Sequence, residues 1–436
     1  MELLNAFAAQ HPHIEYITPS SPTFNPLRQL FSHPEITPSV IIRPPSIPDV
    51  ATVVSFLART RIPFTVRAGG HDMHGRSTRN DTVVLDLRLI NHVEIDKESS
   101  TARVGGGTLI SKLIPALQAD GYVTPVGSIS HVGYVGWAMY GGYGAYSARF
   151  GLGVDQIVGA RVVTADGEVV DADQDGELLR GVKGAGGAFG VVVEVTTRVY
   201  KLEKILAGVV MYKSEDLGGV IRQYNRGYRA LADEGLPAAL SVHQCVIPSP
   251  APTFALLFVW ASEDTQTGEK WLERIGGLAP LLASTVKPTT PQGYLDEVDS
   301  MISMTSNGRM YSISTRQITD EVGEIIAHYM KNIPSDPHII FDAHQLRRDS
   351  PSAQPTPGSV FNAREEHYMY EITAIVQDRN NLKAALAWGG SSKRRCRRRM
   401  REFDHEKVYG GDLPFLRELK RRLDPENVFS AAISYL

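Results

Sequence analysis

Glycine is concentrated in one part of this chain, and that concentration limits the folds that the chain can adopt. The sequence has 39 glycines in 436 residues, and they are densest between positions 69 and 190. Four glycine-rich turns follow one another there: RAGGHD at 67–72, VGGG at 104–107, GGYGAYSARFGLGVD at 141–155 and KGAGGAFG at 183–190. Glycine lets backbone N–H groups approach an anionic ligand without steric cost. A single turn of this kind is usually a plain loop, but four in succession predict a cradle for an extended dinucleotide.

Composition and charge limit the classes of binding partner that the protein can have. Hydrophobic residues make up 42% and charged residues 21%, as in ordinary globular proteins. The net charge of −3 argues against nucleic acid or an anionic membrane surface as the main partner. Two cysteines, Cys245 and Cys396, cannot build a disulfide framework. We identify no signal peptide and no apolar stretch long enough to span a membrane, so we expect a cytoplasmic location.

Strand-like and helix-like segments predict an α+β protein in four parts. Four prolines predict an irregular segment over 1–39. Short strands and helices over 40–205 include a hairpin at Asp166-Gly167. Residues 206–400 predict a second domain with one broad antiparallel sheet flanked by helices. A C-terminal segment, 401–436, contains an amphipathic helix that ends at Asp424-Pro425.

The last glycine turn has a second interpretation, a nicotinamide-binding unit. GAGGAFG is similar to the dinucleotide fingerprint, which follows a strand and opens a helix. Here the glycines follow a helix-like ELLRGVK and open a strand. We therefore disfavour NAD.

Four motifs carry a family resemblance. RAGGHDMHGRS, VGYVGWAMYGGYGAYSARFGLGVDQIVGARVVTADGEVVDAD, GAFGVVVEV and YGGDLPFLRELKRRLDPENVF occur in this order. Together they resemble the berberine bridge enzyme-like flavoproteins, which have the vanillyl-alcohol oxidase type of FAD-binding fold. The resemblance implies an FAD-binding region of two subdomains over 40–205, a substrate domain over 206–400, and a C-terminal segment that returns to the flavin. It also implies oxidation of a small metabolite such as an alcohol, an amine or an alkaloid- or polyketide-like compound of secondary metabolism, with dioxygen as acceptor.

The resemblance also implies cofactor-binding residues. His71 matches the histidine that bonds covalently to the flavin, and Asp412 falls near the ring where relatives carry an Asn-Tyr pair. Ile129 stands where many relatives have a cysteine, so we expect no second covalent link. The remaining residues expected to form the flavin cradle are Arg67, Ala68, Gly69, Gly70, Asp72, Gly75, Ser77, Val132, Gly133, Gly136, Gly142, Gly144, Ser147, Leu152, Gly190 and Val192.

Catalytic candidates come from residues near the flavin and from the expected sheet. His131 lies beside Ile129 and could contact flavin or substrate. In REEHYMYEITAIV, strand alternation puts Glu366, Tyr368 and Tyr370 on one face, with Glu365, His367 and Glu371 on the other. We favour Tyr370 and Glu366 as catalytic residues over a second set, His243, Asp342 and His344. We expect no metal.

Three function classes stay open. The first is an FAD-linked oxidase or dehydrogenase, which we favour. The second is an isomerase or cyclase that keeps the flavin but transfers only protons, and the third is a non-catalytic binding protein. The basic run at 393–401 could be a nuclear signal or a polyanion patch, but a solvated loop is the expected structure. The oligomeric state does not follow from the sequence.

Overall fold

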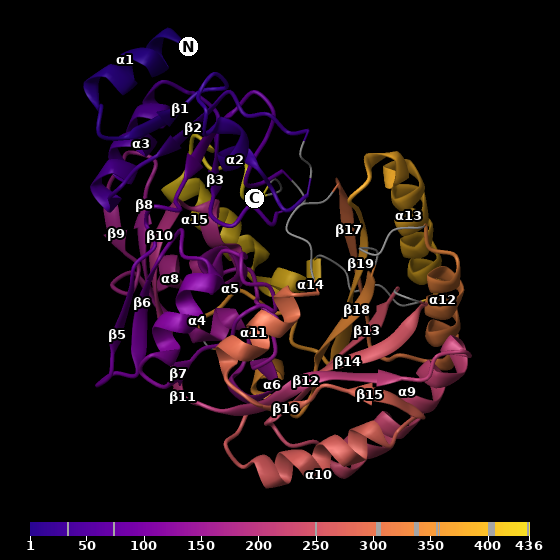
Figure 1. Cartoon of the computed structure of the whole chain (residues 1–436). Coiled ribbons are helices and arrows are strands. Elements are labelled where there is room, and N and C mark those ends of the chain that lie inside the picture. Colours follow the sequence, from indigo (N-terminus) through magenta and orange to yellow (C-terminus); the bar gives the residue numbers. More distant parts are fainter. Residues whose placement is uncertain are drawn as a thin grey trace.

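Figure 1 shows the chain as three main sheets with helices packed on them, in a computed structural model. The structure describes residues 1–32, 35–72, 75–248, 251–301, 307–334, 340–354, 356, 358–399, 406–433 and 436, and for 396–399, 406 and 407 only the backbone. Within these residues, no helix combines the length and the apolar character needed to cross a membrane.

The first sheet has four strands in the order β1-β2-β4-β3. Its strands are β1 (Glu15–Ile17), β2 (Val40–Arg43), β3 (Phe64–Arg67) and β4 (Val83–Asp86). Strand β4 pairs in parallel with both β2 and β3. Helix α3 (Ile47–Arg59) forms the crossover from β2 to β3. Ser46 is its N-cap residue, and the Ser46 side chain accepts a hydrogen bond from the Asp49 backbone amide. Its apolar stripe, which includes Val50 and Leu57, is fully buried.

The segment 1–39, which was predicted to be irregular, contains short regular elements over less than half of its length. That segment contains α1 (Glu2–Gln10), β1 and α2 (Phe24–Arg28). Strand β1 pairs with β2 in antiparallel register, with Tyr16 opposite Ile42. The prolines at 12, 19 and 22 lie between these elements, so they delimit short elements without preventing them.

The second sheet is antiparallel, with five strands in the order β5-β6-β10-β8-β9. Its strands are β5 (Val93–Asp96), β6 (Thr101–Gly105), β8 (Ile157–Val163), β9 (Val169–Asp171) and β10 (Val191–Arg198). The predicted hairpin joins β8 to β9, and Gly167 has the positive φ of 89° that its turn requires. Other elements of this region are α4 (Ile110–Gln118), α5 (Tyr134–Ala138), α6 (Ser147–Phe150), α7 (Gly153–Gln156), α8 (Gly176–Ala185), η1 (Gly186–Ala188), and the pair β7 (Tyr122–Val123) and β11 (Tyr200–Lys201).

The third sheet has eight strands, and its two faces differ. The order is β15-β12-β14-β13-β18-β19-β17, with β16 also on β12. The strands are β12 (Ile205–Tyr212), β13 (Leu240–Ile247), β14 (Thr253–Trp260), β15 (Leu281–Ser284), β16 (Lys287–Thr289), β17 (Asn307–Thr315), β18 (Ile340–Leu346) and β19 (His367–Val376). The helices of this region are α9 (Leu217–Glu234), α10 (Thr265–Gly276), α11 (Pro291–Asp299), α12 (Asp320–Lys331) and α13 (Leu382–Arg399).

Helices α9, α12 and α13 cover the face of the third sheet that points away from the other two sheets (Figure 1). We call this the outer face. Its side chains form one apolar cluster with residues of these helices, among them Tyr224, Val322 and Trp388. The opposite, inner face is directed toward the first two sheets (Figure 1). The first two sheets with their helices form one half of the molecule, the third sheet with its helices forms the other, and α11 lies between the two halves.

The C-terminal part returns to the first half of the molecule. It contains α14 (Glu406–Tyr409), η4 (Gly410–Asp412) and α15 (Leu413–Leu423), and Leu419 packs into the cluster of the second sheet. The basic run was expected as a loop, but its described part continues α13 up to Arg399. Lysine and arginine favour helices, so a run of them extends a helix that has already begun.

Candidate functional site

The loop after β3 holds His71 in a tight turn against a second loop. Gly70 has φ of 75°, a conformation that residues with a side chain rarely adopt. A Cβ added at Gly69 would lie 2.4 Å from the Gly133 nitrogen, so the two loops touch backbone to backbone. This contact brings residues 68–72 next to residues 131–133.

His71 is buried among other rings. Its ring stacks on Phe31, with ring centroids 4.5 Å apart, and lies 4.4 Å from the ring of His131. Burial, with the nearby charges of His131 and Arg67, lowers the pKa of His71 to about 3. Within the described part of the chain, its Nε2 and both nitrogens of His131 are buried without a hydrogen-bond partner. The site therefore presents neutral imidazoles with free nitrogen atoms, and it includes His131, one of the predicted catalytic residues.

The N-terminal segment positions Phe31, which the sequence analysis missed. The buried Arg67 guanidinium donates hydrogen bonds to the carbonyl oxygens of Leu27 and Gln29. The Phe31 amide donates to the Gly70 carbonyl at 3.2 Å. Arg67 was expected in the flavin cradle, and in this structure its guanidinium ties the N-terminal segment to the loop. No motif marks Phe31, because this contact joins residues from separate elements.

Polar atoms without partners line the same stretch of chain. Buried side-chain atoms with no hydrogen-bond partner among the described residues include Thr65 Oγ1, Arg67 Nε, Ser77 Oγ and Thr78 Oγ1. Asp72 differs, because its carboxylate accepts hydrogen bonds from Arg76, at 2.7 Å from Nε. Buried polar groups are nearly always satisfied in native proteins, so unpaired groups indicate a missing polar ligand. These residues fit a cofactor that is rich in hydrogen-bonding atoms.

The predicted cradle glycines serve two purposes. At Gly142, Gly144 and Gly190 an added Cβ would come within 3.0 Å of protein atoms, so these glycines allow close packing. At Gly136 an added Cβ would meet nothing within 4 Å, so this helix position faces open space. Gly75, with φ of 74°, makes only ordinary contacts.

The other predicted cradle residues lie around these loops. The Ser147 hydroxyl accepts a hydrogen bond from the Gly144 amide at 3.0 Å. Leu152 and Val192 are buried in apolar clusters, and Ala68 and Val132 are half-buried on the two touching loops. His74 lies outside the described residues.

Asp412 is held by protein partners. Its carboxylate forms an ion pair with Arg180 and accepts a hydrogen bond from the Asn362 amide at 2.7 Å. The same Asn362 side chain donates to the Tyr409 carbonyl at 2.7 Å. Asp412 therefore fixes the C-terminal segment to α8 and to the strand connection before β19.

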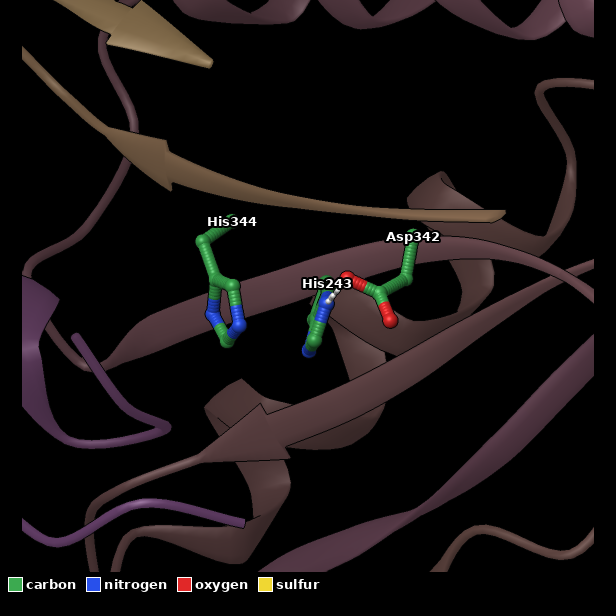
Figure 2. Close-up of side chains that lie close together, drawn as sticks. All are labelled: His243, Asp342 and His344. Atoms are coloured by element: carbon green, nitrogen blue, oxygen red, sulfur yellow. Dashed lines mark hydrogen bonds and ion pairs between the residues drawn. The ribbon is translucent and has the colours of Figure 1, made fainter. Parts of the chain in front are cut away.

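The inner face of the third sheet carries a polar cluster from two neighbouring strands. His243 belongs to β13, and Asp342 and His344 belong to β18. The His243 and His344 ring centroids are 3.9 Å apart, and His243 Nε2 lies 3.4 Å from Asp342 Oδ1. Figure 2 shows the three side chains directed toward one another. Glu371 on β19 lies directly opposite Asp342 in the strand register.

Electrostatics distinguish the groups on this face. Burial, together with the nearby Asp342 carboxylate, raises the pKa of Glu371 to about 8. Burial, together with His243, lowers the pKa of His344 well below the usual value. The cluster therefore holds a proton on one carboxyl group and a neutral imidazole near neutral pH.

The preferred catalytic residues lie elsewhere, which corrects the prediction. Tyr370 is fully buried on the outer face, where its ring packs against Phe341 at 5.2 Å. Glu366 is exposed before β19 begins. The predicted alternation is present, but period-2 spacing cannot say which face is covered by helices. The inner face instead presents His367 and Glu371, with His243, Asp342 and His344.

A pocket joins the inner face to the glycine-rich loops. Its empty volume is about 400 Å³, including the part open to solvent. His243, His344 and Leu257 line it from the sheet, Ser128 and Tyr143 from the loops, and Tyr294 from α11. Tyr143 also shares a 2.9 Å hydrogen bond with His367 Nε2. The pocket is thus shared between the two halves of the molecule.

Comparisons with known proteins agree with this architecture. A profile described as FAD binding domain matches residues 38–173. FAD-linked oxidoreductase aurO of Gibberella zeae is 32% identical over 435 residues, which cover 96% of this chain and 85% of that protein. (R)-6-hydroxynicotine oxidase of Paenarthrobacter nicotinovorans is 35% identical over 230 residues, 51% of this chain and 50% of that protein. The solved structure of BBE-like 1 from Physcomitrella patens has a TM-score of 0.84 at 20% identity, with 99% of each chain covered.

The fold and the matched domain define a flavoprotein of the vanillyl-alcohol oxidase type, as predicted. The similarity over nearly the whole chain is more specific. This chain belongs to the family of FAD-linked oxidoreductases, and it shares the fold of the berberine bridge enzyme-like proteins. It is an FAD-dependent oxidase or dehydrogenase, which confirms the predicted α+β class, cofactor and enzyme class.

Proposed function

We propose that this enzyme binds FAD through a covalent bond from His71 and oxidises a small organic metabolite, with dioxygen as the electron acceptor. The main support is the buried Nε2 of His71, which has no hydrogen-bond partner among the residues that the structure describes. A nucleophilic nitrogen must be unprotonated, and the pKa of about 3 keeps this imidazole neutral. Phe31 stacks on the ring and limits its rotation.

The residues around His71 suit the rest of the cofactor. Ser77, Thr78 and Thr65 offer unpaired hydroxyl groups, and Gly136 faces open space. FAD supplies the acceptor for a hydride removed from the substrate. Ile129 occupies the position of the cysteine in relatives that have two covalent links, so we expect a single bond.

The substrate side is the inner face of the third sheet. A substrate that loses a hydride from carbon must also lose a proton from oxygen or nitrogen. The imidazoles of His243 and His344 line the pocket beside the aromatic rings of Tyr143 and Tyr294, and the carboxyl groups of Asp342 and Glu371 lie on the same face of the sheet. An alcohol, an amine or an alkaloid- or polyketide-like metabolite suits this lining. The relatives include a protein named for its oxidation of (R)-6-hydroxynicotine.

Acid precipitation tests the covalent bond. We expect yellow colour and flavin fluorescence to stay with the denatured wild-type chain on a gel. The His71→Ala variant should release its flavin completely, because no other nucleophile replaces the imidazole. His328→Ala, at an exposed position on α12, is the matched control and should keep the bond. Free FAD in the wild-type supernatant would contradict the proposal.

A second function is favoured by the acid–base groups of the inner face, which could isomerise or cyclise a substrate without net oxidation. Aerobic turnover of candidate substrates separates the two. Hydrogen peroxide formed in equal amount to product supports the oxidase. Product without peroxide and without flavin bleaching supports the isomerase or cyclase.

A further inference from the structure

We propose that His243, Asp342 and His344 form a binding site for a divalent transition-metal ion on the inner face of the third sheet. Each residue offers one ligand atom, and these three atoms lie within 4.8 Å of one another. In Figure 2 the three side chains lie side by side, with His243 between His344 and Asp342. Two imidazoles and one carboxylate form a common ligand set for transition metals.

The backbone holds these ligands rigidly. Asp342 and His344 are two residues apart on β18, so strand alternation puts both on the inner face. On β13, Cys245 pairs with Asp342, and His243 lies two residues earlier on the same face. Strand β13 lies between β14 and β18, and β18 lies between β13 and β19, so neither is an edge strand.

The charge balance of this face favours a cation. Asp342 is 7% exposed, and Glu371 lies directly across the strand pair from it. Among the residues that the structure describes, neither carboxyl group has a lysine or arginine partner. The one ion-pair contact of Asp342 there is with His243, at 3.4 Å. A buried carboxylate without a full counter-charge is costly, so a bound dication would stabilise Asp342.

The ligand types indicate which metals fit. Imidazole nitrogen favours Zn²⁺, Ni²⁺, Co²⁺ or Fe²⁺ over Mg²⁺ and Ca²⁺, which prefer oxygen ligands. Three protein ligands leave a coordination position open. His243 and His344 line the pocket, so that position would face the substrate. If the proposed oxidation is correct, the ion would hold a substrate oxygen and make its proton easier to lose. Metal binding itself does not depend on that step.

Metal titration of the flavin-loaded full chain tests the site. After chelator treatment and dialysis, Zn²⁺ and Ni²⁺ are titrated by calorimetry, and bound metal is measured by mass spectrometry of the dialysed protein. We expect one ion per chain for the wild type. His344→Ala and the isosteric Asp342→Asn should each weaken binding by about 100-fold or more, since even indirect partners of a metal often contribute 10–100-fold.

The control is His328→Ala, which removes an exposed histidine from α12 and should leave binding unchanged. Retention of covalent flavin and an unchanged melting temperature in Asp342→Asn show that the variant is folded. Absence of stoichiometric metal in the wild type would overturn the site, and so would equal metal affinity in the wild type and Asp342→Asn. In either case, a proton shared between Asp342 and its neighbours would take the place of the metal ion as the positive charge. If the wild type has no covalent bond between His71 and the flavin, the proposed function is contradicted, but the result of the metal titration is unaffected.

Discussion

His71 shows how a single side chain is tuned by its surroundings. The motif supplies the residue, but the pKa of about 3 comes from burial and from the neighbouring His131 and Arg67. Phe31 and His131 enclose the ring from separate segments of the chain. The result is an imidazole that is neutral over the whole physiological range and has a buried nitrogen atom without a partner.

Acidification should destabilise the flavin-free protein through His71. Its folded pKa lies below the unfolded value of 6.5, so below pH 6.5 the unfolded state binds a proton that the folded state excludes. The stability contribution is complete above pH 6.5 and falls as the pH drops toward 3. At pH 5 the loss is about 2 kcal/mol, from 1.5 pH units at about 1.4 kcal/mol each.

Urea unfolding of riboflavin-starved protein at pH 7 and pH 5 measures this loss. The His71→Asn variant, which lacks the titrating group, should lose about 2 kcal/mol less than the wild type between these pH values. Equal losses would show that His71 is accessible to protons in the folded state.

At the scale of elements, glycine serves different purposes at two nearby positions, one in a turn and one in a helix. Gly144 packs against the segment that follows β7, and a Cβ added at Gly144 would be 1.9 Å from the Val126 carbonyl oxygen. Gly136, in the short helix α5, has nothing within 4 Å of that point. Gly144 therefore allows close backbone packing, whereas Gly136 leaves space beside the candidate cofactor site.

Alanine at these two glycines should separate folding from cofactor binding. Gly144→Ala forces backbone atoms apart and should destabilise the flavin-free protein by about 3 kcal/mol. Gly136→Ala should leave stability unchanged or raise it by up to about 1 kcal/mol, since alanine favours a helix. If the space beside α5 receives FAD, Gly136→Ala should lower the flavin content, measured as the ratio of absorbance at the flavin band to protein absorbance. A full flavin content in Gly136→Ala would remove this residue from the cradle.

At the scale of the whole molecule, buried polar contacts join the two halves. Arg364, which precedes β19, donates to both carboxylate oxygens of Asp155 in α7, at 2.9 and 2.7 Å. Asp155 also accepts from the Leu152 amide and the Thr356 hydroxyl. The pocket depends on this junction, because its walls come from both halves.

Asp155→Asn should destabilise the protein by about 3–5 kcal/mol, because it leaves the buried Arg364 charge without an opposite charge. Urea unfolding at pH 7 measures the change. Glu365→Gln is the matched control. It breaks the exposed pair with Arg316, in which both side chains are more than half exposed, and should cost less than about 1 kcal/mol. Similar losses in the two variants would mean that the junction contributes little to stability.

The sequence by itself determined the local elements and the class of cofactor. Apolar spacing predicted the C-terminal helix α15, and the Asp166-Gly167 pair predicted the hairpin of β8 and β9, because helix periodicity and turn chemistry are local properties of the chain. The glycine-rich turns predicted a cradle for a dinucleotide, because glycine lets the backbone approach a ligand closely, and the family resemblance implied that this dinucleotide is FAD.

The tertiary structure alone decided which residues meet. Alternation along β19 defined two faces, but only the helices packed on Tyr370 showed that its face is closed. His243 and His344 are neighbours because β13 pairs with β18, two strands far apart in the sequence. Phe31 reaches His71 because Arg67 holds the N-terminal segment. Local patterns report the direction of a side chain relative to its own strand or helix, whereas its neighbours depend on strand order and packing, which no single segment encodes.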